Sequence, residues 1–359
     1  MIADFIIYVY VAVCILLLSY SYIYIYKSRF TQKKINKMEV KWRVLLNEEF
    51  ENLKNSQPVS QKHLEYLRKK LVSINNFISY INAMNYFKEQ ELLPVYLKEI
   101  ASSQQYLAYK YLKRSDMERS FFAHAISLYP PNVGNDYPPI LEILIRYMDN
   151  SSISCRENVL RALYAIGNVY AIENALQFIN NRNLYHHSKL LADGLTTFRG
   201  NKDELMKCLW KHMDDWNNSL MVSVVNFISL NSSEYTSIFL PYLTNEKVYL
   251  ELRIEMLRYY RKYYYEPVRE ILYSFLNSNV NINLSIVSAA VLASYPSQKT
   301  VEVLKNALYH SNWYVRYNAA ESLLKMNISK DEVKDILHGN DQYAKEILTY
   351  MMEQEAILA

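Results

Sequence analysis

Glycine and cysteine are scarce in this chain of 359 residues, and each shortage excludes a class of protein. The 5 glycines never cluster, so the chain lacks the glycine-rich loops with which P-loop and dinucleotide-binding proteins approach phosphate groups. The 3 cysteines are widely spaced and odd in number, which argues against a disulfide framework or a paired-cysteine metal site and favours a reducing compartment. Because 51% of the residues are apolar, the composition is that of a folded chain.

An apolar run without a charged residue extends from Phe5 to Tyr26. As an α-helix this run would be about 33 Å long, which is enough to cross the hydrocarbon core of a bilayer. Tyrosines gather toward both ends of the run, as is typical of segments that meet a membrane interface. No basic residue precedes the run and no small-residue cleavage site follows it, which argues against a cleaved signal peptide. We therefore expect residues 1–26 to form a transmembrane anchor.

Basic residues follow the apolar run. Residues 27–43 contain a single acidic side chain, Glu39, among many basic ones, whereas only Asp4 is charged before the run. By the positive-inside rule, this asymmetry predicts a single-pass cell-membrane protein whose C-terminal part is cytoplasmic. We expect residues 27–57 to continue the membrane helix as a basic stalk and to contact anionic lipid headgroups. The headgroup-binding candidates are Lys27, Arg29, Lys33, Lys34 and Lys37.

From about residue 138 the sequence repeats with a period of 32 residues. Polar turns separate two columns of mostly apolar residues, and strand signals are weak, so each unit predicts two antiparallel helices. Such a pair cannot bury its apolar face alone, and neighbouring pairs should therefore stack. The first column is Leu144, Leu176, Cys208, Leu240, Leu272 and Leu304, and the second is Leu163, Leu195, Phe227, Tyr259, Val291 and Leu323.

The sixth unit contains the run NWYVRYNAAESL at residues 312–323. This run resembles the HEAT repeat (armadillo-like) family, in which an acidic or amide residue is followed by Val-Arg, Ala-Ala and Leu. The resemblance implies an all-α protein, here a transmembrane helix followed by a HEAT-like α-α superhelix of the membrane-anchored bacterial type. It also implies that Arg316, and Arg156 in the first unit, bond the inter-helix turns of adjacent repeats. The resemblance is specific for the fold and uninformative for function.

The repeat organises the rest of the chain around residues 138–327, which hold six HEAT-like units. A proline-rich connector from Tyr129 to Pro139 precedes them, because its prolines cannot continue a helix. Helical patterns within residues 58–137 predict divergent N-terminal repeats or a cap. Residues 328–359 are polar and amphipathic, which favours C-terminal capping helices.

Residues with catalytic or metal-binding chemistry are scattered along the sequence. The 7 histidines include no HExxH motif, and no GxSxG nucleophile elbow occurs. We therefore expect a protein that is not an enzyme and that has no cofactor and no metal site. Two alternatives stay open: a HEAT-like enzyme subunit similar to the bilin lyases, and a HEAT-like nucleic-acid-binding protein. The nearly neutral charge of the chain after residue 43 argues against nucleic acid as the partner.

The second helix of each HEAT-like unit is expected to line the concave side of the superhelix. In the third to fifth units the expected lining is mainly apolar, and in the end units it is charged, which is typical of a protein-binding surface. The predicted groove residues are Met221, Val225, Arg253, Leu257, Arg261 and Ala289. We therefore predict a membrane-tethered scaffold that binds a protein partner, which we expect to be another membrane protein. Accessory subunits of membrane glycosyltransferase or polysaccharide-synthesis systems are the analogy that this combination brings to mind.

Tyrosine is unusually frequent, with 34 residues, and several of them lie in the run from Arg258 to Tyr265. Two explanations are open for this run. Tyrosine has A/T-rich codons, so its abundance can reflect genomic base composition. Alternating basic and aromatic side chains can also grip a peptide or stack on nucleobases.

Overall fold

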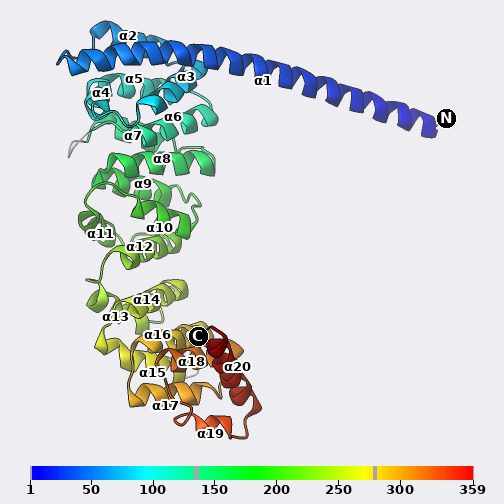
Figure 1. Ribbon diagram of the computed structural model, residues 1–359, viewed down its shortest axis with the longest axis vertical. Helices are drawn as coiled ribbons and strands as arrows, with labels where there is room; N and C mark the ends of the chain where they lie inside the picture. Colours follow the sequence, from blue (N-terminus) through cyan, green and yellow to red (C-terminus); the bar gives the residue numbers. More distant parts are fainter. Residues whose placement is uncertain (1, 133–136, 278–280, 359) are drawn as a thin grey trace. The chain divides into compact units, whose positions relative to one another are not determined.

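The computed structural model describes residues 2–132, 137–277 and 281–358, so part of the proline-rich connector lies outside the described residues. Within these ranges the regular structure is helical and no strand occurs. The chain divides into two compact units, residues 1–178 with 197–200 and residues 179–196 with 201–359 (Figure 1). The predicted fold class is confirmed, because a long apolar N-terminal helix is followed by HEAT-like helical hairpins.

The first unit begins with one long helix, against which shorter helices pack. Side chains of Ser60, Ser115 and Ser152 cap the starts of three of them, and Ser115 forms a capping box with Glu118. The helices of this unit are α1 (Ile2–Lys54), α2 (Gln61–Lys70), α3 (Ile74–Met84), η1 (Asn85–Phe87), α4 (Leu93–Glu99), α5 (Ala101–Tyr111), α6 (Asp116–Leu128), α7 (Pro139–Arg146), α8 (Ile153–Ile166) and the part of α9 (Val169–Asn181) up to Phe178.

Helix α1 contains the apolar run and the basic residues that follow it in one uninterrupted helix. The most apolar stretch of 18 residues in α1 has a mean hydropathy of 1.9, and none of these residues is buried. By length and composition α1 can therefore cross a membrane. The second half of α1 is different, because Ile35, Trp42, Leu46 and Phe50 are buried and α3 packs beside them. The predicted stalk is therefore exposed only to about residue 34, and beyond that point α1 belongs to the core of the first unit.

In the second unit, the second helices of successive hairpins stack on one another. Helix α12 contacts α10 and α14, and α16 contacts α14 and α18. The helices of this unit are α10 (Ser188–Thr196), α11 (Lys202–Trp210), α12 (Asn218–Asn231), α13 (Thr236–Thr244), α14 (Leu250–Lys262), η2 (Glu266–Val268), α15 (Arg269–Asn277), α16 (Ile282–Val291), η3 (Leu292–Ser294), α17 (Gln298–Ala307), α18 (Trp313–Lys325), α19 (Lys334–Leu337) and α20 (Gln342–Leu358).

The two columns of the sequence repeat are buried to different extents. All six residues of the second column are buried, with at most 1% of their surface exposed. In the first column Cys208 and Leu240 are only half-buried, because α11 and α13 turn other side chains, such as Leu209 and Phe239, into the core. The 32-residue period therefore predicts where each hairpin lies in the sequence. The rotation of each first helix about its own axis depends on the helices that pack against it.

Candidate functional site

The predicted groove residues on α12, α14 and α16 do not form an exposed surface. Val225, Leu257 and Ala289 are fully buried, so the prediction was wrong for these three residues. Each of these helices packs against its own first helix and against the second helices on either side. The half-buried or exposed positions lie one residue further on, at Asn226, Arg258 and Ala290.

The other predicted groove residues have different environments. Arg253 is 7% exposed, and its Nε donates a hydrogen bond of 2.8 Å to the carbonyl oxygen of Leu243 in the last turn of α13. Burial lowers the pKa of this guanidinium. Met221 is half-buried and Arg261 is exposed, so these two remain at the surface. Most of the residues that were predicted to line a groove are therefore buried in the core of the hairpins.

Arg156 and Arg316, which the HEAT resemblance implied would bond the turns of adjacent repeats, each bond the turn of their own hairpin. Arg156 Nη1 donates a hydrogen bond of 2.6 Å to the carbonyl oxygen of Ser151, in the turn before α8. Arg316 Nη1 donates to the carbonyl oxygens of His310 and Ser311, in the turn before α18. Arg119 at the start of α6 reaches the following hairpin, where its Nη1 donates to the carbonyl oxygen of Asp149 over 3.3 Å. These bonds satisfy carbonyl groups that the helix ends leave free.

The five headgroup-binding candidates lie on α1 directly after its apolar run. All of them are exposed, namely Lys27, Arg29, Lys33, Lys34 and Lys37. Their positions just beyond the apolar run agree with a role at a lipid surface, and this role stays a prediction.

A buried polar network joins four helices of the first unit. Glu49 Oε1 on α1 lies 3.4 Å from His63 Nδ1 on α2 and accepts a hydrogen bond of 3.3 Å from Ser60 Oγ. On the other side of the ring, His63 Nε2 lies 2.9 Å from the hydroxyl of Tyr96 on α4, which lies 3.2 Å from the hydroxyl of Tyr80 on α3. The network therefore connects the C-terminal half of α1 to three separate helices.

Glu49 and His63 lie at the floor of a surface depression of about 580 Å³, whose rim carries Glu48, Lys62 and Lys69. Glu49 is 7% exposed, and its Oε2 has no hydrogen-bond partner among the described residues. Burial raises the pKa of the Glu49 carboxyl and lowers the pKa of His63 to about 4. A neutral imidazole beside a carboxyl group can accept a proton, but the buried ring mainly ties α1 to the unit.

Sequence reasoning did not identify this network. His63 was one of 7 scattered histidines, and Glu49 is 14 residues away from it on another helix. The tyrosines that complete the network come from two further helices. The only signal in the sequence was a histidine within an otherwise apolar helix face, which by itself is typical of many core positions.

Acidification from pH 7 to pH 5 is expected to destabilise the packing around His63. The pKa of this histidine is 6.5 in the unfolded chain and about 4 in the folded unit, so only the unfolded chain binds a proton between these values. Stability is therefore lost as the pH falls, by about 2 kcal/mol at pH 5. The raised pKa of Glu49 acts in the opposite sense, because it favours proton binding by the folded state.

The measurement is the free energy of local opening of α2 and α3, from hydrogen exchange of the full chain in detergent at both pH values. The control variant is His63→Gln, which keeps a polar side chain but cannot titrate. Both proteins retain Glu49, so its contribution is common to the two. On acidification from pH 7 to pH 5, the free energy of opening should therefore fall by about 2 kcal/mol more in the wild type than in the variant. An equal loss in the two proteins would contradict the role given to His63.

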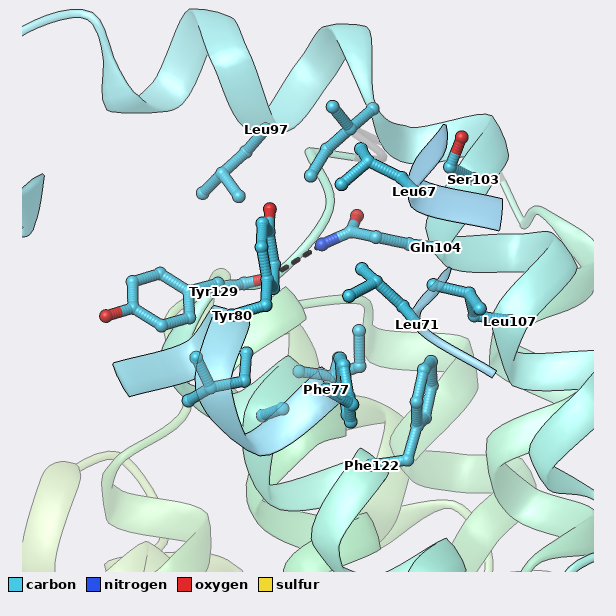
Figure 2. Close-up of a pocket in the computed structure, with 14 residues that line it drawn as sticks. Leu67, Leu71, Phe77, Tyr80, Leu97, Ser103, Gln104, Leu107, Phe122 and Tyr129 are labelled. Atoms are coloured by element: carbon cyan, nitrogen blue, oxygen red, sulfur yellow. Dashed lines mark hydrogen bonds between the residues drawn. The ribbon is translucent and has the colours of Figure 1, made fainter. Parts of the chain in front are cut away.

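A small cavity lies in the core of the first unit, between α2, α3, α5 and α6. Figure 2 shows the amide of Gln104 directed toward Tyr129, where its Nε2 donates a hydrogen bond of 3.0 Å to the carbonyl oxygen. The rest of the lining is mainly apolar and includes Phe77 and Phe122. The free volume of about 30 Å³ has room for about two water molecules. The cavity is therefore too small for a cofactor or a lipid chain.

Exposed aromatic side chains gather at the start of α18, next to α20. Trp313 is 48% exposed, Tyr314 59% and Tyr343 67%. The Trp313 ring centroid lies 5.1 Å from that of Tyr314 and 5.0 Å from that of Tyr317. The guanidinium of Arg316 lies 5.2 Å from the centroid of the Tyr343 ring. These five residues are called the aromatic patch below.

Metal-binding geometry is not found in the part of the chain that the structure describes. No group of three or more histidine, cysteine, aspartate or glutamate side chains there could hold a metal ion. The burial of Cys155 raises its pKa to about 12, so this thiol is held in its protonated, unreactive form.

Comparison with known proteins gives a weak likeness of fold. No protein-family model matches the chain, and no curated protein matches it. Among solved structures, human deoxyhypusine hydroxylase in complex with glycerol is similar over 82% of this chain and 96% of its own, with 12% identity and a TM-score of 0.29. Membership of the HEAT family therefore stays a prediction from the sequence.

The prediction that this protein is not an enzyme was drawn from the scatter of catalytic residue types along the sequence, and the comparison contradicts it, because a solved structure to which the chain is similar is that of an enzyme. The likeness is too weak to transfer a reaction to this chain.

Proposed function

We propose that this chain is a membrane-anchored helical-repeat protein that holds a protein partner at the cytoplasmic face of the bilayer. Binding of a partner rests on one observation, the aromatic patch of α18 and α20. Tryptophan, tyrosine and arginine are the residues that most often dominate the energy of protein interfaces. Most of the patch is solvent-exposed, although its apolar rings would be more stable when buried.

The anchor in this proposal is the first half of α1. Its apolar run is long enough to span a bilayer and is not covered by other parts of the first unit (Figure 1). The basic residues from Lys27 to Lys37 follow the run, which supports a cytoplasmic location for both helical units.

The partner is expected to be another protein of the same membrane. Tethering both proteins to one bilayer raises their effective concentration, which strengthens association without any new contact. An accessory role in a membrane glycosyltransferase or polysaccharide-synthesis complex is one specific form of this proposal. Salt-sensitive binding of DNA by the full chain would instead support the nucleic-acid alternative.

The test is photo-crosslinking from position 314 in membranes that contain the full chain, with the crosslinked protein identified by mass spectrometry. Trp313→Ala is expected to reduce crosslinking about tenfold or more, because truncation of an aromatic anchor typically costs at least about 2 kcal/mol. The matched control is Tyr249→Ala, which removes a 45%-exposed ring elsewhere on the second unit. If Trp313→Ala leaves the crosslink unchanged, the aromatic patch is not the binding surface.

A further inference from the structure

The direction of α3 shows which end of the first unit faces the apolar run. Ser79 Oγ on α3 donates a hydrogen bond of 3.1 Å to the carbonyl oxygen of Ile35 on α1. Further along α1, the Arg43 guanidinium lies 3.2 Å from the centroid of the Tyr86 ring, which belongs to η1 directly after α3. Because the partners advance together along the two helices, α3 runs parallel to α1. The start of α3 therefore points toward the apolar run.

The turn between α2 and α3 lies close to the level at which the apolar run ends. Ser73, just before α3, is six residues ahead of Ser79, which corresponds to about 9 Å along a helix. On the parallel helix α1, Arg29 precedes Ile35 by the same six residues, so Arg29 lies at the level of Ser73. The apolar run ends three residues earlier, at Tyr26. If α1 spans a bilayer with this run, the turn therefore lies in the headgroup region.

The turn between α5 and α6 lies at the same end. The hydroxyl of Tyr111, the last residue of α5, donates a hydrogen bond of 2.9 Å to the carbonyl oxygen of Leu71 in the turn after α2. This bond is buried and connects the two turns directly. Both turns therefore face the same side as the apolar run.

These two turns carry a concentration of exposed positive charge. The basic end of the first unit is defined as Lys69, Lys70, Lys110, Lys113 and Arg114, which are all exposed. Acidic residues also lie nearby: Asp116 accepts bonds from Arg119 and from the backbone of Ser152, Glu118 completes a capping box, and the carbonyl oxygen of Asp149 accepts a bond from Arg119. They offset only part of the positive charge.

The opposite end of the same helices has a different charge balance. Beyond the end of α3 lie Lys88, Glu89 and Glu91, and α4 ends with Lys98 and Glu99, so acidic residues slightly outnumber basic ones there. All five are exposed. An excess of basic over acidic residues is therefore found at the end that faces the apolar run and not among these five residues, as expected if the basic end meets a negative surface.

We propose that the basic end of the first unit rests on the anionic lipid headgroups of the bilayer that α1 spans. This inference depends on the proposed anchor and adds a second contact, made by the folded unit itself. Basic residues within a Debye length of an anionic bilayer are attracted to its surface. Exposed Tyr106 and Tyr109 lie beside these lysines, with Lys110 Nζ 5.2 Å from the Tyr106 ring centroid, and tyrosine is favoured at the same interface. The contact would hold the first unit at a fixed height and tilt.

The test is acetylation of lysine side chains in the full chain, reconstituted into nanodiscs of phosphatidylcholine with or without phosphatidylglycerol. The acetylation rates of Lys69, Lys70, Lys110 and Lys113 are expected to fall about fivefold or more in the anionic discs. Lys88 and Lys98 serve as internal controls in the same sample, and their rates should not change. High salt should remove the difference, because it screens the headgroup charge.

A charge-reversed variant identifies the surface. The double substitution Lys113→Glu with Arg114→Glu should abolish the protection of Lys69 and Lys70 from acetylation in anionic discs. The matched double substitution Lys88→Glu with Lys98→Glu should preserve that protection. If Lys33 and Lys34 on α1 are protected in anionic discs but Lys69 and Lys113 are not, the anchor stands and this inference is wrong. If the chain does not enter nanodiscs, both the anchor and the inference are wrong.

Discussion

Deletion of residues 1–26 is expected to move the protein from the membrane fraction to the soluble fraction. The apolar run is the part of the described chain that is long and apolar enough to span a bilayer, and none of its most apolar window is buried by the rest of the fold. Once the run is removed, only electrostatic contacts with the surface remain, and these are reversible and weaken in salt. The measurement is fractionation of cells followed by washing of the membranes at high salt and at alkaline pH.

A point variant gives the same test without shortening the chain. Leu16→Arg with Leu17→Arg places two charges in the middle of the run, at a cost of about 2.5–3.5 kcal/mol each for insertion. The matched control, Leu16→Ile with Leu17→Ile, should remain in the membrane pellet. Retention of the arginine variant after an alkaline wash would contradict the anchor, and so would a mature protein whose N-terminus lies beyond residue 26.

The helical hairpins could be predicted because their signal is local. Apolar residues recur at helical spacing, and the second column, from Leu163 to Leu323, is buried throughout. The rotation of the helices could not be predicted in the same way. Val225 and Asn226 are adjacent on α12, and which of them is buried depends on the neighbouring helices rather than on the periodicity of α12 itself.

The open question about the tyrosine-rich run shows the same limit. Tyr259 and Tyr260 are 1% and 0% exposed, and the Tyr259 hydroxyl accepts a hydrogen bond of 3.1 Å from the backbone of Tyr235. Tyr264 is 58% exposed. Two of these rings therefore belong to the core, and the run is not one continuous binding surface. Composition alone could not separate the two kinds of position.

The polar network and the basic end of the first unit required the tertiary structure. Glu49, His63 and Tyr96 meet only because α1, α2 and α4 converge. Lys70 and Lys113 are far apart in sequence, and they lie at one end only because Tyr111 joins the two turns. No periodicity within a single helix contains this information.

Leu257→Ala is expected to destabilise the second unit by about 2–5 kcal/mol, whereas Arg258→Ala should change its stability by less than about 0.5 kcal/mol. Leu257 is 0% exposed, so its truncation leaves a cavity between α14 and the helices packed around it. Arg258 is exposed and forms a surface ion pair with Glu255, and such pairs contribute little to stability. The two adjacent positions therefore test the helical phase directly.

The measurement for this pair is hydrogen exchange in α12, α14 and α16 of the full chain, which gives the free energy of opening for each helix. The sequence prediction that Leu257 lines a groove gives the opposite expectation, since truncation of a groove residue would leave the fold intact and weaken partner crosslinking. If the Leu257→Ala variant shows the hydrogen exchange of the wild type but loses the crosslink to the partner, Leu257 lines a groove as the sequence predicted. If Arg258→Ala is the destabilised variant, the packing of α14 described above is wrong.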